Sequence, residues 1–94
     1  MEKETLADIT AVILTFNEEK HIERCLESIK SVVKRIVVID SFSTDETLNI
    51  IKKFNTEIFQ NKWVNYAKQM NWGIEKAKIN TNWILRLDAD EFFT

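Results

Sequence analysis

The sequence predicts an α/β fold in which a mostly parallel sheet lies between two layers of helices, with the chain order βαβαβαβ. Two observations support this prediction. Short runs of β-branched apolar residues recur along the chain, and amphipathic segments with helical spacing lie between them. The chain has 94 residues, which is the length of one domain. We therefore expect one three-layer domain whose parallel strands are joined by right-handed crossovers.

Four apolar segments are predicted to form the strands, and they span residues 9–14, 35–40, 57–60 and 82–87. The first two, ITAVIL and RIVVID, are almost continuously apolar. Such runs are typical of strands that are buried on both faces of a parallel sheet. The third segment is short, and the fourth leads directly into the sequence DADE.

Three segments between these strands are predicted to be helices. The apolar face of the first, which follows Glu18, comprises Ile22, Cys25, Leu26, Ile29 and Val33. The sequence Ser43-Thr44-Asp45-Glu46 matches a capping box and predicts the start of the second helix, which has Leu48, Ile51 and Phe54 on one side. The third spans residues 65–78, with Ala67, Met70, Ile74 and Ala77 facing inward.

The third helix contains Gly73, the only glycine of the chain. Glycine inside a helix costs about 1 kcal/mol relative to alanine. We expect close packing beneath a binding site to be the reason for this residue.

Composition and charge exclude several classes of protein. The chain is 45% hydrophobic and 30% charged, which indicates a globular domain rather than a disordered one. Its formal net charge is −2, whereas a general nucleic-acid binder carries a basic excess, so no nucleic-acid partner is expected. The single cysteine, Cys25, cannot form an internal disulfide, which fits a reducing compartment.

Polar residues follow the predicted strands at the edge of the sheet where the carboxyl ends of parallel strands meet. Thr15 and Asn17 follow the first strand, Asp40 ends the second, and Asp88 and Asp90 follow the fourth. In sheets of this kind, ligands bind beyond the carboxyl ends of the strands. The convergence of carboxylates from separate strands therefore predicts a binding site at this edge.

The segment Asp88-Ala89-Asp90 is the centre of this predicted site. Mg²⁺ usually takes one or two carboxylates together with phosphate oxygens of the substrate, and two acids separated by one residue suit that role. A metal held in this way can neutralise the charge of a departing diphosphate. The alternative is a solvated loop whose acids cap a following helix.

Several other residues have two interpretations. Asp40 either caps the next helix or faces water, or it accepts hydrogen bonds from a base or ribose. Phe16 either stacks on a nucleobase or packs within its loop. Arg86 needs a carboxylate partner if its strand is buried. The tryptophans are expected to pack within the protein rather than to bind sugar; they are Trp63, which lies in a loop, Trp72 and Trp83.

Four motifs, in this order, resemble family 2 of the glycosyltransferases. Residues 12–19 (VILTFNEE) resemble its first strand and loop, and residues 37–47 (VVIDSFSTDET) resemble its second strand and turn. Residues 71–77 resemble its Asn-x-Gly helix pattern, and residues 87–91 (LDADE) resemble its metal-binding Asp-x-Asp. The resemblance extends from about Ile9 to Glu91. The sequence of residues 40–45 (DSFSTD) further resembles the branch of lipopolysaccharide core glycosyltransferases.

The resemblance implies a Rossmann-like N-terminal half of a GT-A fold. It also implies a metal-dependent enzyme, using Mg²⁺ or Mn²⁺, that transfers a sugar from a nucleotide-sugar donor, generally with inversion. A UDP-sugar is the expected donor. The residues implied to contact the nucleotide sugar are Thr15, Phe16, Glu18, Asp40 and Asp88. Asp40 matches the acid that binds the base, Asp88 matches the acid near the ribose and the metal, and Asp90 matches the metal ligand on the diphosphate.

Three positions depart from the family's pattern. Leu14 stands where a proline is usual, Ser41-Phe42 where Asp-Gly is usual, and Met70 where an arginine often precedes the asparagine. Neutralisation of the diphosphate then falls to the metal, to Lys68 or to Arg86, and the sequence does not choose among them. These departures concern the identity of the donor more than the fold.

Family members continue well beyond an Asp-x-Asp motif. We therefore expect residues 1–94 to be the donor-binding N-terminal part of an enzyme, with the acceptor site and the general base downstream, and to be inactive alone. The implied acceptor is a lipid-linked glycan, such as a lipopolysaccharide core. The resemblance implies that the enzyme is cytoplasmic and acts at the inner face of the membrane. No apolar run approaches the ~18 residues that span a bilayer. We also expect marginal stability or self-association.

Two other classes of function remain as alternatives. A Mg²⁺-dependent phosphohydrolase of the Asp-x-Asp type usually has its nucleophilic acid after the first strand, where this chain has Thr15 and Asn17. A non-catalytic module that binds a nucleotide or a partner protein would leave the Asp-x-Asp motif without a purpose. Dinucleotide-binding and P-loop proteins are excluded because their glycine-rich motifs are absent.

Overall fold

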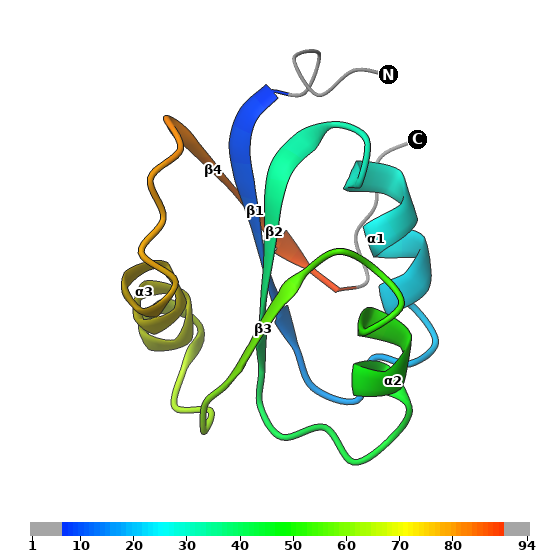
Figure 1. The fold of residues 1–94 in the computed structure, drawn as a ribbon. Coiled ribbons are helices and arrows are strands. Elements are labelled where there is room, and N and C mark those ends of the chain that lie inside the picture. Colours follow the sequence, from blue (N-terminus) through cyan, green and yellow to red (C-terminus); the bar gives the residue numbers. More distant parts are fainter. Residues whose placement is uncertain (1–6, 90–94) are drawn as a thin grey trace.

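The computed structural model describes residues 7–89, which form a three-layer α/β domain (Figure 1). The elements are β1 (Ala7–Thr15), α1 (Ile22–Ile29), β2 (Val33–Asp40), α2 (Thr47–Ile51), β3 (Glu57–Gln60), α3 (Tyr66–Lys76) and β4 (Trp83–Asp88). Every described strand pairing is parallel, and the strand order is β3-β2-β1-β4. Helices α1 and α2 cover one face of the sheet and α3 covers the other. The predicted fold class and element order are confirmed.

The register of the strands aligns their carboxyl ends. Thr15 of β1 pairs with Asp40 of β2, and Asp40 pairs with Gln60 of β3. On the other side of β1, Leu14 pairs with Asp88 of β4. The polar residues that follow the strands are therefore brought to one edge, as the sequence predicts.

Each face of the sheet has its own core, because successive residues of a strand point to opposite faces. The core beneath α1 and α2 includes Ile13 and Val38 of the sheet together with Ile22 and Leu26 of α1. The core beneath α3 contains Val12, Leu14, Val37, Ile39, Met70 and Ala77. Burial of each large aliphatic side chain contributes about 1.5–3 kcal/mol. Both faces of β1 and β2 are thus covered, which explains their almost continuous apolar sequences.

Helix α3 approaches the sheet closely at Gly73. A Cβ atom added there would lie 2.5 Å from Cγ1 of Ile39. The expected close packing of this glycine is confirmed, and it brings α3 against β2. The predicted inward face of the helix is partly wrong, because Ala67 is exposed and Gln69 is buried in the position next to Met70.

The predicted capping box does not form. Helix α2 begins at Thr47, and the side chain of its N-cap residue, Glu46, makes no capping hydrogen bond. Ser43 Oγ instead donates to Asp40 Oδ1 at 2.5 Å, which commits this hydroxyl to the sheet edge. Asp45 instead makes the hydrogen bonds at the start of the helix. Its Oδ1 accepts from the N–H of Thr47 at 2.9 Å and from the Thr47 hydroxyl.

Strand β4 lies at one edge of the described sheet, and its side chains are more exposed than the sequence suggests. Arg86 is exposed, so it does not need the carboxylate partner that burial would require, and Trp83 is 70% exposed rather than packed. Trp72 does pack, with its ring edge-to-face against Phe59 at 6.5 Å between centroids. Within the described part of the chain, no helix has both the length and the apolar character that crossing a membrane requires.

Candidate nucleotide-sugar site

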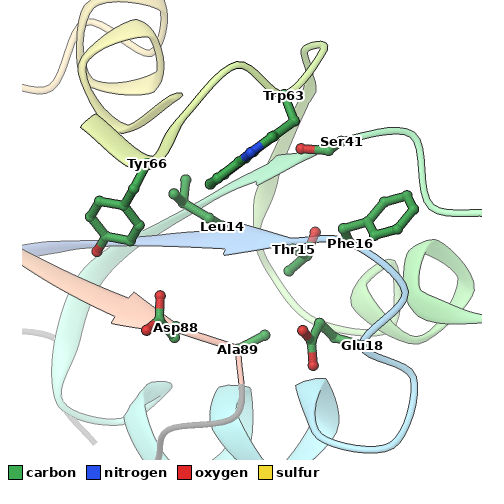
Figure 2. Close-up of a pocket in the computed structure, with 9 residues that line it drawn as sticks. All are labelled: Leu14, Thr15, Phe16, Glu18, Ser41, Trp63, Tyr66, Asp88 and Ala89. Atoms are coloured by element: carbon green, nitrogen blue, oxygen red, sulfur yellow. The ribbon is translucent and has the colours of Figure 1, made fainter. Parts of the chain in front are cut away.

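A cavity of about 490 Å³ lies at the carboxyl edge of the sheet, around the end of β1 (Figure 2). Its lining residues are Leu14, Thr15, Phe16, Glu18, Ser41, Trp63, Tyr66, Asp88 and Ala89. Glu18 and Asp88 lie on the β4 side of the end of β1, and Ser41 and Trp63 lie on the β2 side. The cavity therefore has a carboxylate side and an uncharged side.

Four of the residues predicted to contact a nucleotide sugar line this cavity: Thr15, Phe16, Glu18 and Asp88. Of the two interpretations of Phe16, packing within its loop is wrong, because its side chain is 56% exposed. Asp90, the predicted metal ligand, lies outside the described residues. The roles of these side chains toward a ligand stay predictions.

The carboxylate side is formed by Asp88, which ends β4, and Glu18, in the segment between β1 and α1. The Glu18 carboxylate contacts His21 Nδ1 at 3.3 Å, and its backbone N–H donates to Thr47 Oγ1 at 2.8 Å. No group of three or more metal-ligating side chains occurs between residues 7 and 89. Mg²⁺ and Mn²⁺ sites that use substrate phosphates need only one or two carboxylates. Asp88 at the cavity, followed two residues later by Asp90, fits that donor set.

Asp40 is placed differently from the other predicted site residues, because it is fully buried and does not line the cavity. Its carboxyl group accepts hydrogen bonds from Thr15 Oγ1 at 2.6 Å, from the N–H of Ser43 at 2.7 Å and from Gln60 Nε2 at 3.3 Å, in addition to the Ser43 hydroxyl. The structure thus gives Asp40 a role in joining the ends of three strands. A direct contact between Asp40 and a base stays a prediction.

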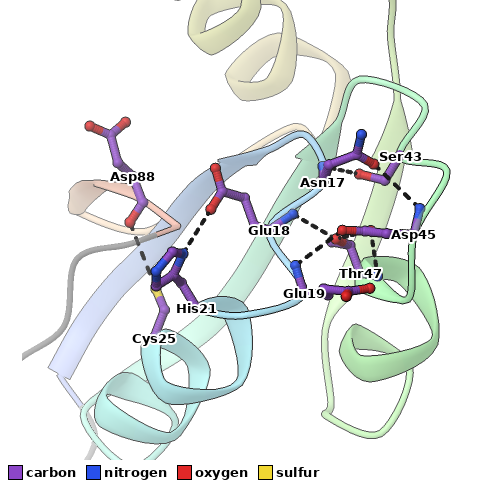
Figure 3. Close-up of polar contacts among 9 residues, drawn as sticks. All are labelled: Asn17, Glu18, Glu19, His21, Cys25, Ser43, Asp45, Thr47 and Asp88. Carbon is purple, nitrogen blue, oxygen red and sulfur yellow. Dashed lines mark hydrogen bonds and ion pairs between the residues drawn. The ribbon is translucent and has the colours of Figure 1, made fainter.

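Beyond Asp40, the loop after β1 is joined to the loop after β2 by hydrogen bonds that we call the interloop network (residues 15–19 and 40–47; Figure 3). Asn17 is its centre. Its backbone has φ 52°, a left-handed conformation that asparagine tolerates. Its Oδ1 accepts from the N–H of Thr44 at 2.8 Å, and its own N–H donates to Ser43 Oγ at 2.8 Å. The network fixes the backbone on either side of Phe16 and Glu18.

Asp45 completes the interloop network, where its Oδ2 accepts from the N–H of Glu19 at 3.3 Å. Desolvation acts to raise the pKa of Asp45. Hydrogen bonds from the hydroxyl and N–H of Thr47 and from the N–H of Glu19 outweigh that effect and lower the pKa below its usual value. Asp45 is therefore an ionised acceptor at neutral pH.

Sequence reasoning missed the residues on the uncharged side. Trp63 was expected to pack, yet it is 49% exposed and its indole lies over Leu14 (Figure 2). Ser41 and Tyr66 also line the cavity. The available signal was the position of Ser41, directly after Asp40 at a strand end. No comparable signal exists for Trp63, because residues 61–65 belong to no regular element.

Comparisons with known proteins agree with this geometry. The family model described as "Glycosyl transferase family 2" matches residues 10–94. Among curated relatives, the chain is 41% identical over 96 residues to the SPbeta prophage-derived glycosyltransferase SunS of Bacillus subtilis, covering 99% of this chain and 22% of SunS. It is 30% identical over 88 residues to the lipopolysaccharide core biosynthesis glycosyltransferase LpsC of Rhizobium meliloti, covering 88% of this chain and 32% of LpsC.

An uncharacterised glycosyltransferase of Rickettsia conorii is 34% identical over 91 residues, which is 97% of this chain and 32% of that protein. The chain thus spans about a third or less of the length of these curated relatives.

The fold also occurs in a solved glycosyltransferase. Glucosyl-3-phosphoglycerate synthase of Mycobacterium tuberculosis, in complex with Mn²⁺, UDP and glucosyl-3-phosphoglycerate, superposes with a TM-score of 0.70 at 20% identity, covering 96% of this chain and 37% of that one. The likeness shows that the two share the GT-A type of fold. Because the family model covers almost the whole sequence, this chain belongs to glycosyl transferase family 2.

Proposed function

We propose that this chain is the donor-binding part of a glycosyltransferase. It binds a nucleotide-diphosphate sugar, with UDP as the nucleotide, in the cavity at the carboxyl edge of the sheet. The protein that contains it transfers the sugar, with inversion, to a lipid-linked glycan such as a lipopolysaccharide core, at the cytoplasmic face of a membrane. The name of LpsC supports the acceptor, and the UDP complex of glucosyl-3-phosphoglycerate synthase supports the nucleotide.

The observation that carries this proposal is the two-sided cavity. Its volume of about 490 Å³ is in the range of small-molecule sites, which is roughly 300–1,000 Å³. Carboxylates on one side suit a metal-bound diphosphate, and aromatic and aliphatic surface on the other suits a neutral ring. A site for an anion alone would present basic groups, and none of the cavity's lining residues is basic.

Asp88 and Asp90 are the residues that would hold the metal, which is Mg²⁺ or Mn²⁺. A bound metal supplies a positive charge that stabilises the departing diphosphate. The chain's own contribution is positional. Strand β4 ends at Asp88 beside the end of β1, and the interloop network holds Glu18 on the same side of the cavity.

Calorimetric titration of the full chain with UDP, in the presence and absence of Mn²⁺, tests the proposal. We expect Mn²⁺ to strengthen UDP binding, and we expect Asp88→Asn and Asp90→Asn to abolish the metal-dependent part. The matched control is Asp8→Asn, which removes the same charge near the start of β1, at the opposite end of the sheet.

Unchanged Mn²⁺ dependence in both Asp88→Asn and Asp90→Asn would contradict the metal assignment. Absence of binding by any nucleoside diphosphate would contradict the donor-binding function.

A further inference from the structure

The chain between β3 and α3 and the first turn of α3 are exposed without a break. Each residue from Lys62 to Lys68 is exposed, and three of them have large apolar or aromatic side chains: Trp63, Val64 and Tyr66. Val64 is 65% exposed and does not line the cavity. Exposed apolar side chains that gather in one place mark a surface that binds another molecule. We call residues 62–68 the exposed segment.

The two residues that flank the exposed segment are hydrogen-bonded to each other. The buried Gln69 side chain donates from Nε2 to the carbonyl of Asn61 at 3.1 Å, and its Oε1 accepts from Asn61 Nδ2 at 3.0 Å. The N–H of Asn61 donates to the carbonyl of Asp40 at 3.0 Å, which attaches this base to the end of β2. Because its base is closed and attached to the sheet, the exposed segment presents its side chains from a fixed support.

Charge distinguishes the exposed segment from the other parts of this end of the sheet. Residues 58–74 contain two lysines, Lys62 and Lys68, and no acidic residue, although acids outnumber bases in the whole chain. Apart from the buried Asp40, the acids at the carboxyl edge lie in the loops that lead to α1 and α2 and at the end of β4. Helix α3 and the chain before it lie on the other face of the sheet from α1 and α2 (Figure 1). The exposed segment therefore combines apolar side chains with positive charge.

We infer that the exposed segment is a membrane-docking surface, and that its partner is the interface of a bilayer that contains anionic lipids. Tryptophan and tyrosine favour the boundary between lipid and water, and lysines are attracted to anionic headgroups. Val64 enters the apolar side of this boundary, with Trp63 and Tyr66 beside it at the level of the headgroups. Lys62 and Lys68 lie against the lipid phosphates.

Charge also argues against a second copy of the chain as the partner. A two-fold contact brings the same surface of both copies together. Such a contact would place the lysines of one exposed segment against those of the other, with no acid in residues 58–74 to compensate them. An anionic lipid surface supplies the opposite charge.

The position of the exposed segment relates this surface to the donor site. The inference rests on the proposed function, in which the acceptor is lipid-linked. Trp63 and Tyr66 belong to the exposed segment and also line the cavity. Docking therefore holds the mouth of the donor site against the lipid surface, where an acceptor that stays in the bilayer can reach the donor.

Co-sedimentation of the full chain with two sets of vesicles tests this inference. One set contains phosphatidylglycerol and phosphatidylcholine, and the other contains phosphatidylcholine alone. We expect stronger binding to the first set, and we expect it to weaken as the salt concentration rises. Lys62→Gln should weaken the binding roughly fivefold, and Val64→Asp should weaken it about tenfold or more.

Two matched controls make the same changes away from the exposed segment. Val32→Asp alters another exposed valine, which directly precedes β2 at the opposite end of the sheet. Lys52→Gln removes an exposed lysine that directly follows α2, on the other face of the sheet. We expect both variants to bind the anionic vesicles as the unaltered chain does.

UDP binding in solution separates this inference from the proposed function. Val64→Asp should bind UDP as tightly as the unaltered chain, because Val64 does not line the cavity. Undiminished vesicle binding by Val64→Asp would overturn the inference, as would a failure of the unaltered chain to bind anionic vesicles. Self-association that Val64→Asp abolishes would overturn it in favour of a second copy. If the unaltered chain binds the vesicles but no nucleoside diphosphate, the docking surface stands and the proposed function fails.

Discussion

The two sides of the cavity are held in different ways. On the side of α1 and α2, the interloop network joins backbone to side chain at every residue from Asn17 to Glu19. On the side of α3, the position of Trp63 depends on helix packing at Gly73 and on the buried amide of Gln69. The first side fixes the path of the backbone where charged groups must hold their geometry. The second fixes only the ends of a segment and leaves an aromatic side chain half exposed.

The largest effect on the free energy of unfolding is expected from removal of the Asp40 carboxylate, which accepts hydrogen bonds at the base of the interloop network. Asp40→Ala leaves the Thr15 hydroxyl and the Ser43 N–H and hydroxyl without their shared partner in a buried position. Unsatisfied buried groups cost about 1–3 kcal/mol each, so we expect the free energy of unfolding to fall by about 3 kcal/mol or more. Urea unfolding measures this change.

The control for Asp40→Ala is Glu27→Ala, which removes one partner of an exposed ion pair with Lys30 and should cost less than about 1 kcal/mol. A loss of similar size in both variants would show that the network does not hold the sheet edge together.

A smaller effect on stability is expected from a substitution in α3, on the opposite side of the cavity. Gly73→Ala places a Cβ 2.5 Å from Cγ1 and 2.7 Å from Cδ1 of Ile39, which is fully buried. Overpacking costs about 1–3 kcal/mol, and the better helix propensity of alanine offsets about 1 kcal/mol of it. We expect a lower melting temperature, partly restored when Ile39→Val removes Cδ1. A Gly73→Ala variant as stable as the original chain would show that α3 can move away from β2 at little cost.

The smallest effect on stability is expected from a change in pH, and it should be confined to the interloop network and absent from the side of the cavity next to α3. The pKa of Asp45 is lowered in the folded chain, so its contribution to stability is present above its ordinary pKa and is lost as pH falls through the lowered value. NMR titration should show the amides of Glu19 and Thr47 responding in that acidic range. Asp45→Asn should remove the response. The amides of Gln69 and Asn61, whose hydrogen bonds are to amide, hydroxyl and carbonyl groups, should not respond in that range.

The parts of the molecule that follow from local patterns could be predicted from the sequence. Apolar runs identified β1 and β2, and the residues after the strands identified the edge that carries the cavity. The capping box at Ser43 failed because a buried carboxylate competes for the same hydroxyl. The burial of Arg86 could not be judged, since it depends on which strand lies at the edge of the described sheet.

The uncharged side was beyond prediction for a similar reason. Ser41, Trp63 and Gln69 come from three separate segments, and their meeting depends on the close approach of α3 to β2. Helical spacing placed Ala67 on the inner face, whereas the packing of the helix buries the polar Gln69. Periodicity carries no information about which polar side chain a neighbouring loop will bind.

The pairing of β1 with β4 has a consequence for the order in which the protein is made. Thr10 pairs with Ile84, so the central strand emerges from the ribosome long before one of its two neighbours does. Until then one edge of β1 presents unpaired amides and carbonyls, which can pair wrongly with other chains. Non-local pairing of this kind also slows folding. The carboxylate of Asp88 therefore joins the cavity only after β4 has been synthesised and has paired with β1.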